Sequence, residues 1–463
     1  MYVLGALIVC AFLLGGSSRP EMPGLMILNP LSALGLGYGL FTLRMADIAR
    51  YRVLMGLGLC VILLAILHVI PLPPSIWHGL PGRETIVAID AQLGLQELWR
   101  PFTMDPTASY NALAGLLLPA AVLVLAIQMQ APQHEKLLAL LLIIGFLSAF
   151  LSLGQIIGDA HGPLYLYAIT NNGFPVGLFA NRNHHAVFLD GLLPLTYAWV
   201  MMAKGNWRDL ESARGRRAVL GGGLALLIVA IVLVAGSRAG LICLLIAVTA
   251  TLAIVSLAPK RKSSSRARKP VAEPMWKKYL PAAATVATLG AIVFATVVMG
   301  RARSFERFVG LDPIADMRGQ IAPTVIDIIG KTFPWGTGIG SFDNVFRMFE
   351  PDSLLSDRYV NHAHNDFLEF AMTGGLPLVL IILVALGWIA LQAFKLLRMG
   401  IKRAIAERLL AVCALLALGL TVIGSIVDYP LRTAAYASYA IMLLMWLATA
   451  GKRDADPQND PAI

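Results

Sequence analysis

The chain has 463 residues, of which 57% are hydrophobic and only 14% are charged. Soluble domains carry about 25% charged residues, so this composition excludes a set of soluble domains, a disordered chain and a secreted disulfide scaffold. The formal net charge of +10 lies in short loops between apolar runs, which argues against nucleic acid as a partner. The sequence therefore predicts an all-α integral membrane protein.

Long apolar runs recur along the whole chain, and each is close to the length of about 20 residues that crosses a bilayer. Four cysteines lie inside these runs and are predicted to be small buried hydrophobic residues: Cys10, Cys60, Cys243 and Cys413. About twelve transmembrane helices are predicted, over residues 2–16, 25–43, 53–72, 109–129, 136–157, 185–203, 218–236, 239–258, 279–299, 374–394, 409–427 and 433–450.

Basic residues predict the orientation of these helices. Segment 259–278 carries eight Lys or Arg and is predicted to be cytoplasmic. Alternating outward from it places both termini inside, and 24 of the 37 basic residues then share that side. The other thirteen basic residues are all Arg except Lys331. Arg suits bidentate binding of phosphate or carboxylate. Random surface charge would also explain most of these residues.

The largest outer loop, residues 300–373, is short for an independent domain and is predicted to be a lid-like element packed on the spans. Four of its apolar residues recur at near-helical spacing: Ile314, Ile321, Val325 and Ile328. This pattern predicts an amphipathic helix lying along the membrane interface.

Two polar clusters stand where the outer loops enter spans. In the stretch 181–185, Asn183 could merely cap the helix that follows, or the stretch could contact a ligand. Arg238, in the tight turn 235–240, could snorkel to the membrane surface, or it could bind an anion beside a helix N-terminus.

Two further clusters belong to the loop 300–373. Arg318 opens the predicted lid helix, and residues 334–342 contain three glycines, which let the backbone approach a ligand closely. The stretch 359–378 carries His362, His364, Asn365, Asp366 and Glu369.

The two histidines of that stretch allow three interpretations. A His-x-His pair could bind a metal, or the histidines could simply face the membrane interface. The sharper hypothesis is that a neutral imidazole accepts a proton from a hydroxyl nucleophile. Outward-facing arginines, a histidine and a lid together suit a reaction on a lipid diphosphate, with the arginines offsetting charge on the leaving group. No Asp-x-Asp motif is apparent, so this hypothesis requires neither a metal nor another cofactor.

At these residues the sequence resembles the O-antigen ligase and O-antigen polymerase superfamily. The resemblance rests on the order and spacing of four stretches, 181–189, 236–240, Arg318 with 334–342, and 362–378. It divides the chain into N-terminal helices (1–174), a catalytic region with the outer loop (175–395), C-terminal helices (396–450) and a cytoplasmic tail (451–463).

The resemblance implies a metal-independent, inverting glycosyltransferase of the C-type membrane architecture in the bacterial inner membrane, with a periplasmic active site. The donor would be a glycan on undecaprenyl diphosphate. His364 would be the catalytic base, and Arg238 and Arg318 would bind the diphosphate. Because His362 lies two residues away, the choice of base stays open. The other residues expected to touch substrate are His362, Asn365, Asn183, His184, Arg182 and Arg432.

The acceptor divides the family. A polymerase extends another lipid-linked repeat, whereas a ligase passes the glycan to the lipid A core. The stretch 428–433 resembles members associated with exopolysaccharide polymerisation and slightly favours a polymerase. Membrane lipids and a chain-length regulator are the further partners expected. A transporter or flippase using mid-membrane residues such as Asp190 and Gln155 is the main rival, and a structural assembly subunit without turnover is a third possibility.

Overall fold

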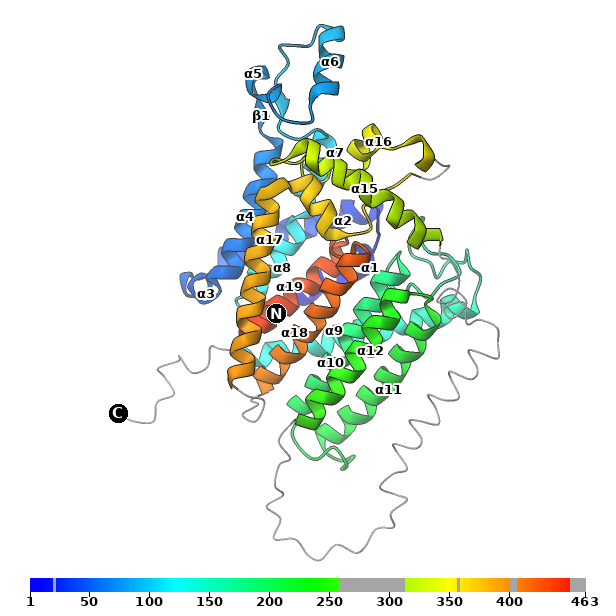
Figure 1. The fold of residues 1–463 in the computed structure, drawn as a ribbon. Helices are drawn as coiled ribbons and strands as arrows, with labels where there is room; N and C mark the ends of the chain where they lie inside the picture. Colours follow the sequence, from blue (N-terminus) through cyan, green and yellow to red (C-terminus); the bar gives the residue numbers. More distant parts are fainter. Residues whose placement is uncertain (20–21, 258–312, 356–358, 400–405, 450–463) are drawn as a thin grey trace, which may run out of the picture.

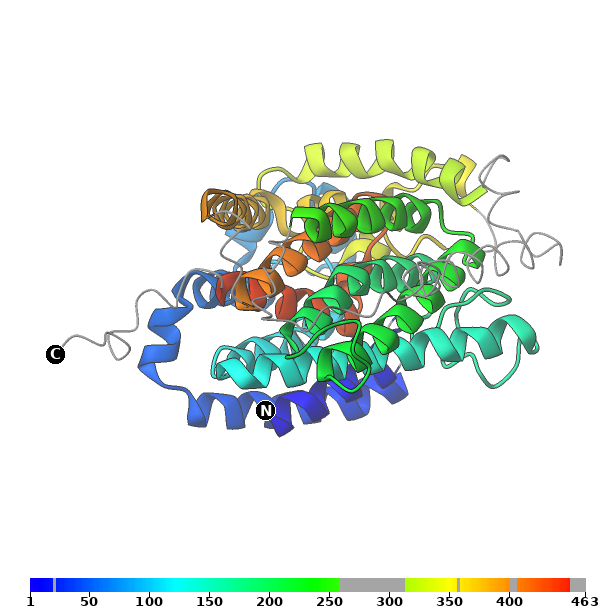
Figure 2. The same cartoon turned by 90° about the horizontal axis from the view of Figure 1, so that it is seen from below.

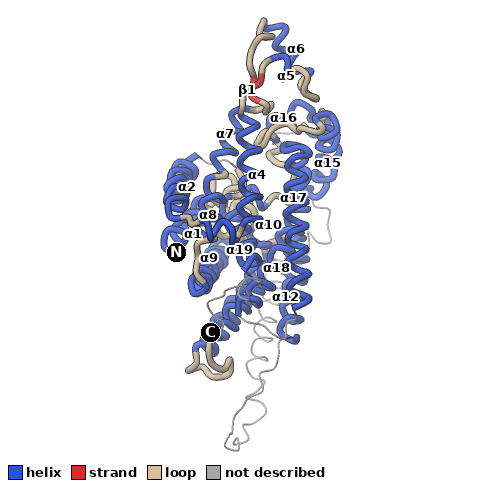
Figure 3. The backbone as a smooth tube through the Cα atoms, turned by 90° about the vertical axis from the view of Figure 1, so that its left-hand side faces the viewer, coloured by secondary structure: helices blue, strands red, loops and turns tan. Residues whose placement is uncertain are grey.

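The computed structural model describes residues 1–463 except 20–21, 258–312, 356–358, 400–405 and 450–463. In the described part, helices make up almost all of the regular structure, and the strands are two two-residue segments, as Figure 3 shows. The strands β1 (Pro71–Leu72) and β2 (Arg100–Pro101) pair antiparallel. The prediction of an all-α integral membrane protein is confirmed.

Within the described residues, nine helical segments are long and apolar enough to cross a membrane. They form a bundle of tilted helices (Figures 1 and 2). These segments comprise α2 (Met22–Thr42), α4 (Arg52–Val69), α7 (Pro106–Gly115) continued by α8 (Leu117–Ala126), α9 (Ala131–Ile157), α10 (Arg182–Met202), α11 (Ala213–Val234), α12 (Arg238–Leu257), α17 (Asp366–Met399) and α18 (Ala406–Val427). Two shorter apolar helices, α1 (Tyr2–Leu14) and α19 (Ala434–Thr449), pack against the others.

Eleven of the twelve predicted spans therefore correspond to apolar helices, and the span predicted at 279–299 lies outside the described residues. The prediction of four buried cysteines is confirmed for Cys243 and Cys413, whereas Cys10 is half-buried and Cys60 is exposed on α4. The short helix α3 (Met45–Arg50) precedes α4.

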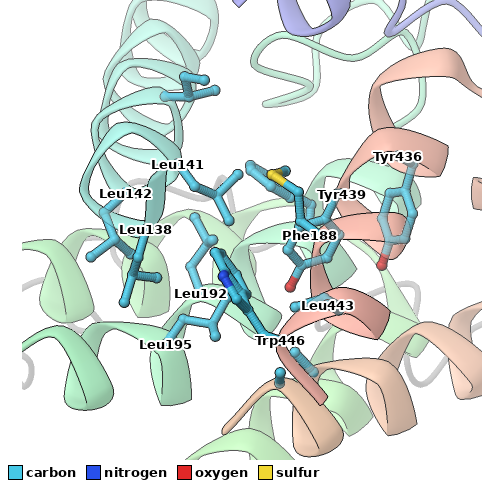
Figure 4. Close-up of a cluster of buried hydrophobic side chains, with 14 of the residues drawn as sticks. Leu138, Leu141, Leu142, Phe188, Leu192, Leu195, Tyr436, Tyr439, Leu443 and Trp446 are labelled. Carbon is cyan, nitrogen blue, oxygen red and sulfur yellow. The ribbon is translucent and has the colours of Figure 1, made fainter. Parts of the chain in front are cut away.

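The centre of the bundle is formed around α10, which packs against α9, α11, α12 and α18. Figure 4 shows Leu138, Leu141 and Leu142 of α9 facing α10 and α19. Phe188 of α10 and Trp446 of α19 are completely buried among them. This dense apolar packing fixes α10, so that its polar first turn is held in a defined place at one end of the bundle.

An excursion between α4 and α7 rises beyond that end and carries α5 (Pro74–Trp77) and α6 (Glu84–Leu93), seen at the top of Figure 1. Arg83 is completely buried at its base and donates hydrogen bonds to the carbonyls of Pro81 (2.9 Å), Phe102 (3.0 Å) and Gly336 (3.1 Å). Burial lowers the pKa of Arg83 to about 10, which leaves the guanidinium charged at neutral pH. The excursion is thereby joined to the distant stretch 334–342.

The lid-like element contains α15 (Pro313–Thr332), α16 (Phe342–Phe349) and a 3-10 turn, η1 (Asp352–Leu354), and α15 lies across the end of the bundle in Figure 1. Ile321, Val325 and Ile328 of α15 are fully buried against residues that include Phe342 and Phe346 of α16. The predicted helix exists, and its apolar face is buried in the protein. That face packs on protein, because α16 supplies the apolar surface.

Candidate functional site

The polar first turn of α10 is built into the bundle end and is not a loop outside it. Asn181 is the N-cap residue, and its side-chain oxygen accepts a hydrogen bond from the backbone N–H of Asn183 at 2.8 Å. The interpretation of Asn183 as the cap is therefore wrong, since the helix already begins at Arg182. Asn181, His184 and His185 are buried, which is unusual for such polar side chains and calls for partners.

Asp428 supplies the partner for most of this turn. It follows α18 directly and precedes the 3-10 turn η3 (Pro430–Arg432). Its carboxylate is buried and accepts hydrogen bonds from the side-chain amides of Asn183 (2.6 Å) and Asn181 (3.2 Å) and from the backbone N–H of Tyr429 (3.1 Å). His184 Nε2 lies 3.7 Å from the same carboxylate.

The predicted catalytic histidine meets the same carboxylate. His364 Nδ1 lies 3.2 Å from Asp428 Oδ1, and the guanidinium of Arg318 from α15 lies 3.5 Å from Asp428 Oδ2. His364 has a left-handed backbone (φ 50°), a conformation that a non-glycine residue adopts only where its surroundings enforce it. With Nδ1 facing the carboxylate, the neutral ring presents its Nε2 lone pair away from Asp428.

The electrostatics of Asp428 follow from these contacts. Burial would raise the pKa of its carboxyl, but hydrogen bonds from His184 and His364 hold that pKa well below its usual range. Asp428 is therefore ionised at neutral pH. Burial and the charge of Asp428 raise the pKa of Tyr429 above its ordinary value, so this phenol stays neutral.

A second histidine–carboxylate pair lies on the other side of Tyr429. His362 Nδ1 is 2.9 Å from Glu369 Oε1, and the Tyr429 ring contacts the rings of both His362 (4.2 Å between centroids) and His364 (5.0 Å). The two histidines therefore lie side by side around one tyrosine, each with its own carboxylate. Arg432, which is also expected to touch substrate, lies 3.4 Å from Glu369 and 3.5 Å from Asp366.

Asn365 has a structural role at the start of α17. Its side-chain oxygen accepts a hydrogen bond from the Leu368 N–H at 3.1 Å, as an N-cap residue does. The helix it caps bends at Gly375, whose backbone (φ 60°, ψ −161°) is not helical.

The remaining predicted arginines lie at the neighbouring turn. The Arg182 guanidinium stacks over the Phe174 ring at 4.2 Å, and a Cβ placed on Gly236 would be 3.8 Å from Arg182 Nη1. Gly236 is two residues before Arg238, the first residue of α12. The structure therefore brings the turn 235–240 beside the first turn of α10, whereas Arg318 is the predicted arginine with a contact to Asp428.

The glycines of 334–342 approach protein and not an open ligand space. Gly336 has φ 76°, and a Cβ there would be 2.6 Å from the Gly375 nitrogen. The neighbouring backbone hydrogen-bonds the bend of α17, with Thr337 N donating to Met372 O at 3.0 Å. The interpretation as a ligand-binding loop is therefore not needed, because close backbone packing already explains these glycines.

Sequence reasoning missed the two carboxylates around which the site is organised. Asp428 was noted only as part of the stretch 428–433, and Glu369 only as a neighbour of the histidines. An acidic residue directly after an apolar span, on the same side as two His-containing stretches, is the signal that could have identified Asp428.

A comparison with known families matches part of the chain. Residues 223–383, which are 161 of the 463 residues, match the family model described as O-antigen ligase. The resemblance to the O-antigen ligase and polymerase superfamily is thereby confirmed over about a third of the chain, including Arg238, Arg318 and both histidines of 362–364. No curated protein sequence matches the chain. The match implies O-antigen ligase-like glycan transfer by a multi-pass membrane protein, with lipid-linked glycans as substrates.

Proposed function

We propose that the protein is a metal-independent, inverting glycosyltransferase that uses a glycan on undecaprenyl diphosphate as donor. The observation that carries the proposal is the contact of His364 with the buried, ionised Asp428 beside Arg318, inside a chain that matches the O-antigen ligase family. The basic-residue distribution supports a periplasmic site in the bacterial inner membrane, with both termini cytoplasmic.

Each group has a role in a single displacement. Asp428 holds the Nδ1–H of His364, so that Nε2 can accept the proton of the acceptor hydroxyl. The hydroxyl oxygen attacks the anomeric carbon, and the bond from that carbon to the diphosphate oxygen breaks with its electron pair remaining on the diphosphate. Arg318 and Arg238 would bind the leaving diphosphate and offset its charge.

The acceptor separates two versions of this function. We favour a polymerase, which extends another lipid-linked repeat, on the resemblance of the stretch 428–433. The alternative is a ligase that transfers the glycan to lipid A core. The transporter hypothesis is weakened at Gln155, one of the mid-membrane residues that it used. The side-chain oxygen of Gln155 accepts hydrogen bonds from the backbone N–H groups of Val176 and Gly177 and so holds the loop before α10.

The test uses purified protein in nanodiscs, supplied only with the undecaprenyl-diphosphate-linked repeat, and product length is read on a gel. A ladder of longer lipid-linked chains, absent with His364→Ala, is expected for the polymerase. If no ladder forms, adding lipid A core tests the ligase, and failure of both reactions refutes glycosyl transfer. Full activity of a correctly folded His364→Ala protein would refute His364 as the base.

A further inference from the structure

His362 is the one histidine of the site that contacts a carboxylate other than Asp428, among those that the structure describes there. Its Nδ1 lies 2.9 and 3.1 Å from the two oxygens of Glu369, which is almost completely buried. Glu369 is fixed in turn by the Ala363 N–H at 3.0 Å and by Arg432 at 3.4 Å. The imidazole orientation is therefore set by a carboxylate that is itself held in place.

Two aromatic rings lie close to the same imidazole. The centroid of Tyr429 is 4.2 Å from that of His362, and Phe342 of α16 is stacked at 6.4 Å with an angle of 24° between the ring planes. Although both aromatic residues are buried, the His362 side chain remains 20% exposed. With Nδ1 facing Glu369 and the side chain partly exposed, Nε2 is the ring nitrogen that a ligand would meet.

The charges behind His362 indicate what that ligand is. The carboxylate of Glu369 faces the imidazole, and Arg432, which lies 3.4 Å from Glu369, also lies 3.5 Å from Asp366. This guanidinium is therefore shared between two acidic side chains, and the carboxylate against His362 disfavours a diphosphate, which Arg318 on the Asp428 side suits better. An imidazole whose Nδ1–H points at a carboxylate instead has an acceptor lone pair at Nε2, which suits a neutral sugar hydroxyl.

We propose that His362 binds the acceptor glycan by accepting a hydrogen bond from a sugar hydroxyl at Nε2, with Glu369 as the positioning residue that fixes the ring. The inference rests on the proposed function, and it assigns different tasks to the two histidines. His364 removes the proton of the attacking hydroxyl, while His362 places the sugar that carries it.

The test measures binding and turnover separately. The acceptor probe is the repeat oligosaccharide coupled to a short alkyl chain without a diphosphate, and its Kd is measured calorimetrically with the full-length protein in nanodiscs. His362→Ala should raise this Kd about tenfold, the loss of one hydrogen bond of about 1.4 kcal/mol. His362→Gln should stay within about threefold of wild type, because the Gln amide oxygen can accept a hydrogen bond from a position near that of Nε2. His161→Ala, at an outer histidine that contacts Asn172, is the matched control and should bind normally.

Turnover with labelled lipid-linked donor distinguishes placement from proton transfer. His362→Ala should raise the KM for the alkyl-linked acceptor and change kcat little, whereas His364→Gln should lose kcat. Any effect of Glu369→Gln on acceptor Kd should disappear in the His362→Ala background, because the carboxylate acts through the histidine.

Two results would overturn the inference. One is wild-type acceptor Kd in His362→Ala, and the other is a collapse of kcat in both His362→Ala and His362→Gln, which would make His362 the base. Failure of the proposed function has a different signature, namely no transfer by the wild-type protein even though acceptor Kd depends on His362 as described.

Discussion

Replacing Asp428 with Asn tests the organisation of the site most directly, because it keeps the shape of the side chain and removes its charge. Oδ2 accepts hydrogen bonds from Asn181 and Asn183, and Oδ1 accepts one from Tyr429 N–H and faces His364 Nδ1. These four neighbours are donors towards the carboxylate, and the Arg318 guanidinium, 3.5 Å from Oδ2, is a further one. An amide has one oxygen, so its NH2 group must face two donors in either orientation.

The magnitude follows from this count. If the amide oxygen faces Tyr429 and His364, the donors of Asn181 and Asn183 are left unpaired at about 1–3 kcal/mol each, which destabilises the fold by about 2–6 kcal/mol. In the opposite orientation the Tyr429 N–H is the unpaired donor, at about 1–3 kcal/mol. If the amide oxygen stays with the two asparagines, the NH2 group faces His364 and drives its proton to Nε2, which removes the base. Loss of a general base costs about 10²- to 10⁴-fold, so kcat should fall by a factor in that range.

The pH dependence of stability provides a second signature. Because the folded pKa of Asp428 lies below the unfolded value of about 3.9, its ionised form stabilises the native state above that pH. This stabilisation is lost as the pH falls through the folded pKa. The difference in thermal stability between wild-type protein and Asp428→Asn should therefore shrink as the pH is lowered towards this acid range.

The assay is the nanodisc ladder reaction, with folding checked by gel filtration and thermal unfolding. Asp327→Asn is the matched control, since Asp327 forms an exposed pair with Lys331 on α15 and such pairs contribute at most about 1 kcal/mol. A folded Asp428→Asn protein with wild-type kcat would refute the pairing of Asp428 with His364 as a functional contact.

Three further predictions concern other parts of the molecule. Arg83→Ala should lower the free energy of unfolding by about 4 kcal/mol, because three carbonyls lose a charged donor. The control Arg347→Ala, at an exposed i,i+4 pair, should change the free energy of unfolding by less than about 1 kcal/mol. Equal shifts in thermal stability for the two variants would contradict this prediction. Arg318→Lys should reduce kcat/KM for the lipid-linked donor about tenfold and Arg318→Ala further, because the planar fork binds phosphate bidentately, and unchanged donor use in both would remove Arg318 from the diphosphate site. Asp190→Asn should leave glycan transfer unchanged and should change the free energy of unfolding by no more than about 1 kcal/mol. The reason is that, in the described part of the chain, both carboxylate oxygens of Asp190 are buried without a hydrogen-bond partner that the substitution could remove. Loss of an ion-dependent uptake in this variant would instead support the transporter hypothesis.

The apolar pattern predicted the helices well because burial in lipid or in the bundle depends mainly on the length of an apolar run. It failed where polar residues are themselves helical. The sixth span was expected to begin at residue 185, yet α10 begins at Arg182. The polar first turn is stable inside the bundle because Asp428, which is far away in the sequence, accepts its hydrogen bonds. No local pattern contains that information.

The site was predictable in its parts and not in its pairings. Both histidines and Arg318 could be singled out from residue type and position, and the structure brings His364 and Arg318 to one carboxylate. Arg432 is also predicted to touch substrate, and the structure places it beside Glu369 and Asp366. Which buried acid each arginine neutralises depends on tertiary contacts that one sequence does not reveal.

The site is held together by contacts from two parts of the chain, the start of α17 and the helix α15. The Asp366 N–H donates to the Asp428 carbonyl at 3.3 Å, and the Leu431 N–H donates to the Asp366 carboxylate at 3.3 Å. These contacts join the first residue of α17 to the turn 428–431 and support the position of His364 beside Asp428 without involving α15. Arg318 is the contact to Asp428 that α15 contributes among the described residues, so a shift of α15 would move the proposed diphosphate-binding arginine more directly than the proposed base. Donor binding and proton acceptance are therefore expected to respond separately to substitutions in the α15–α16 contact, with donor KM changing while the pH dependence of kcat stays the same.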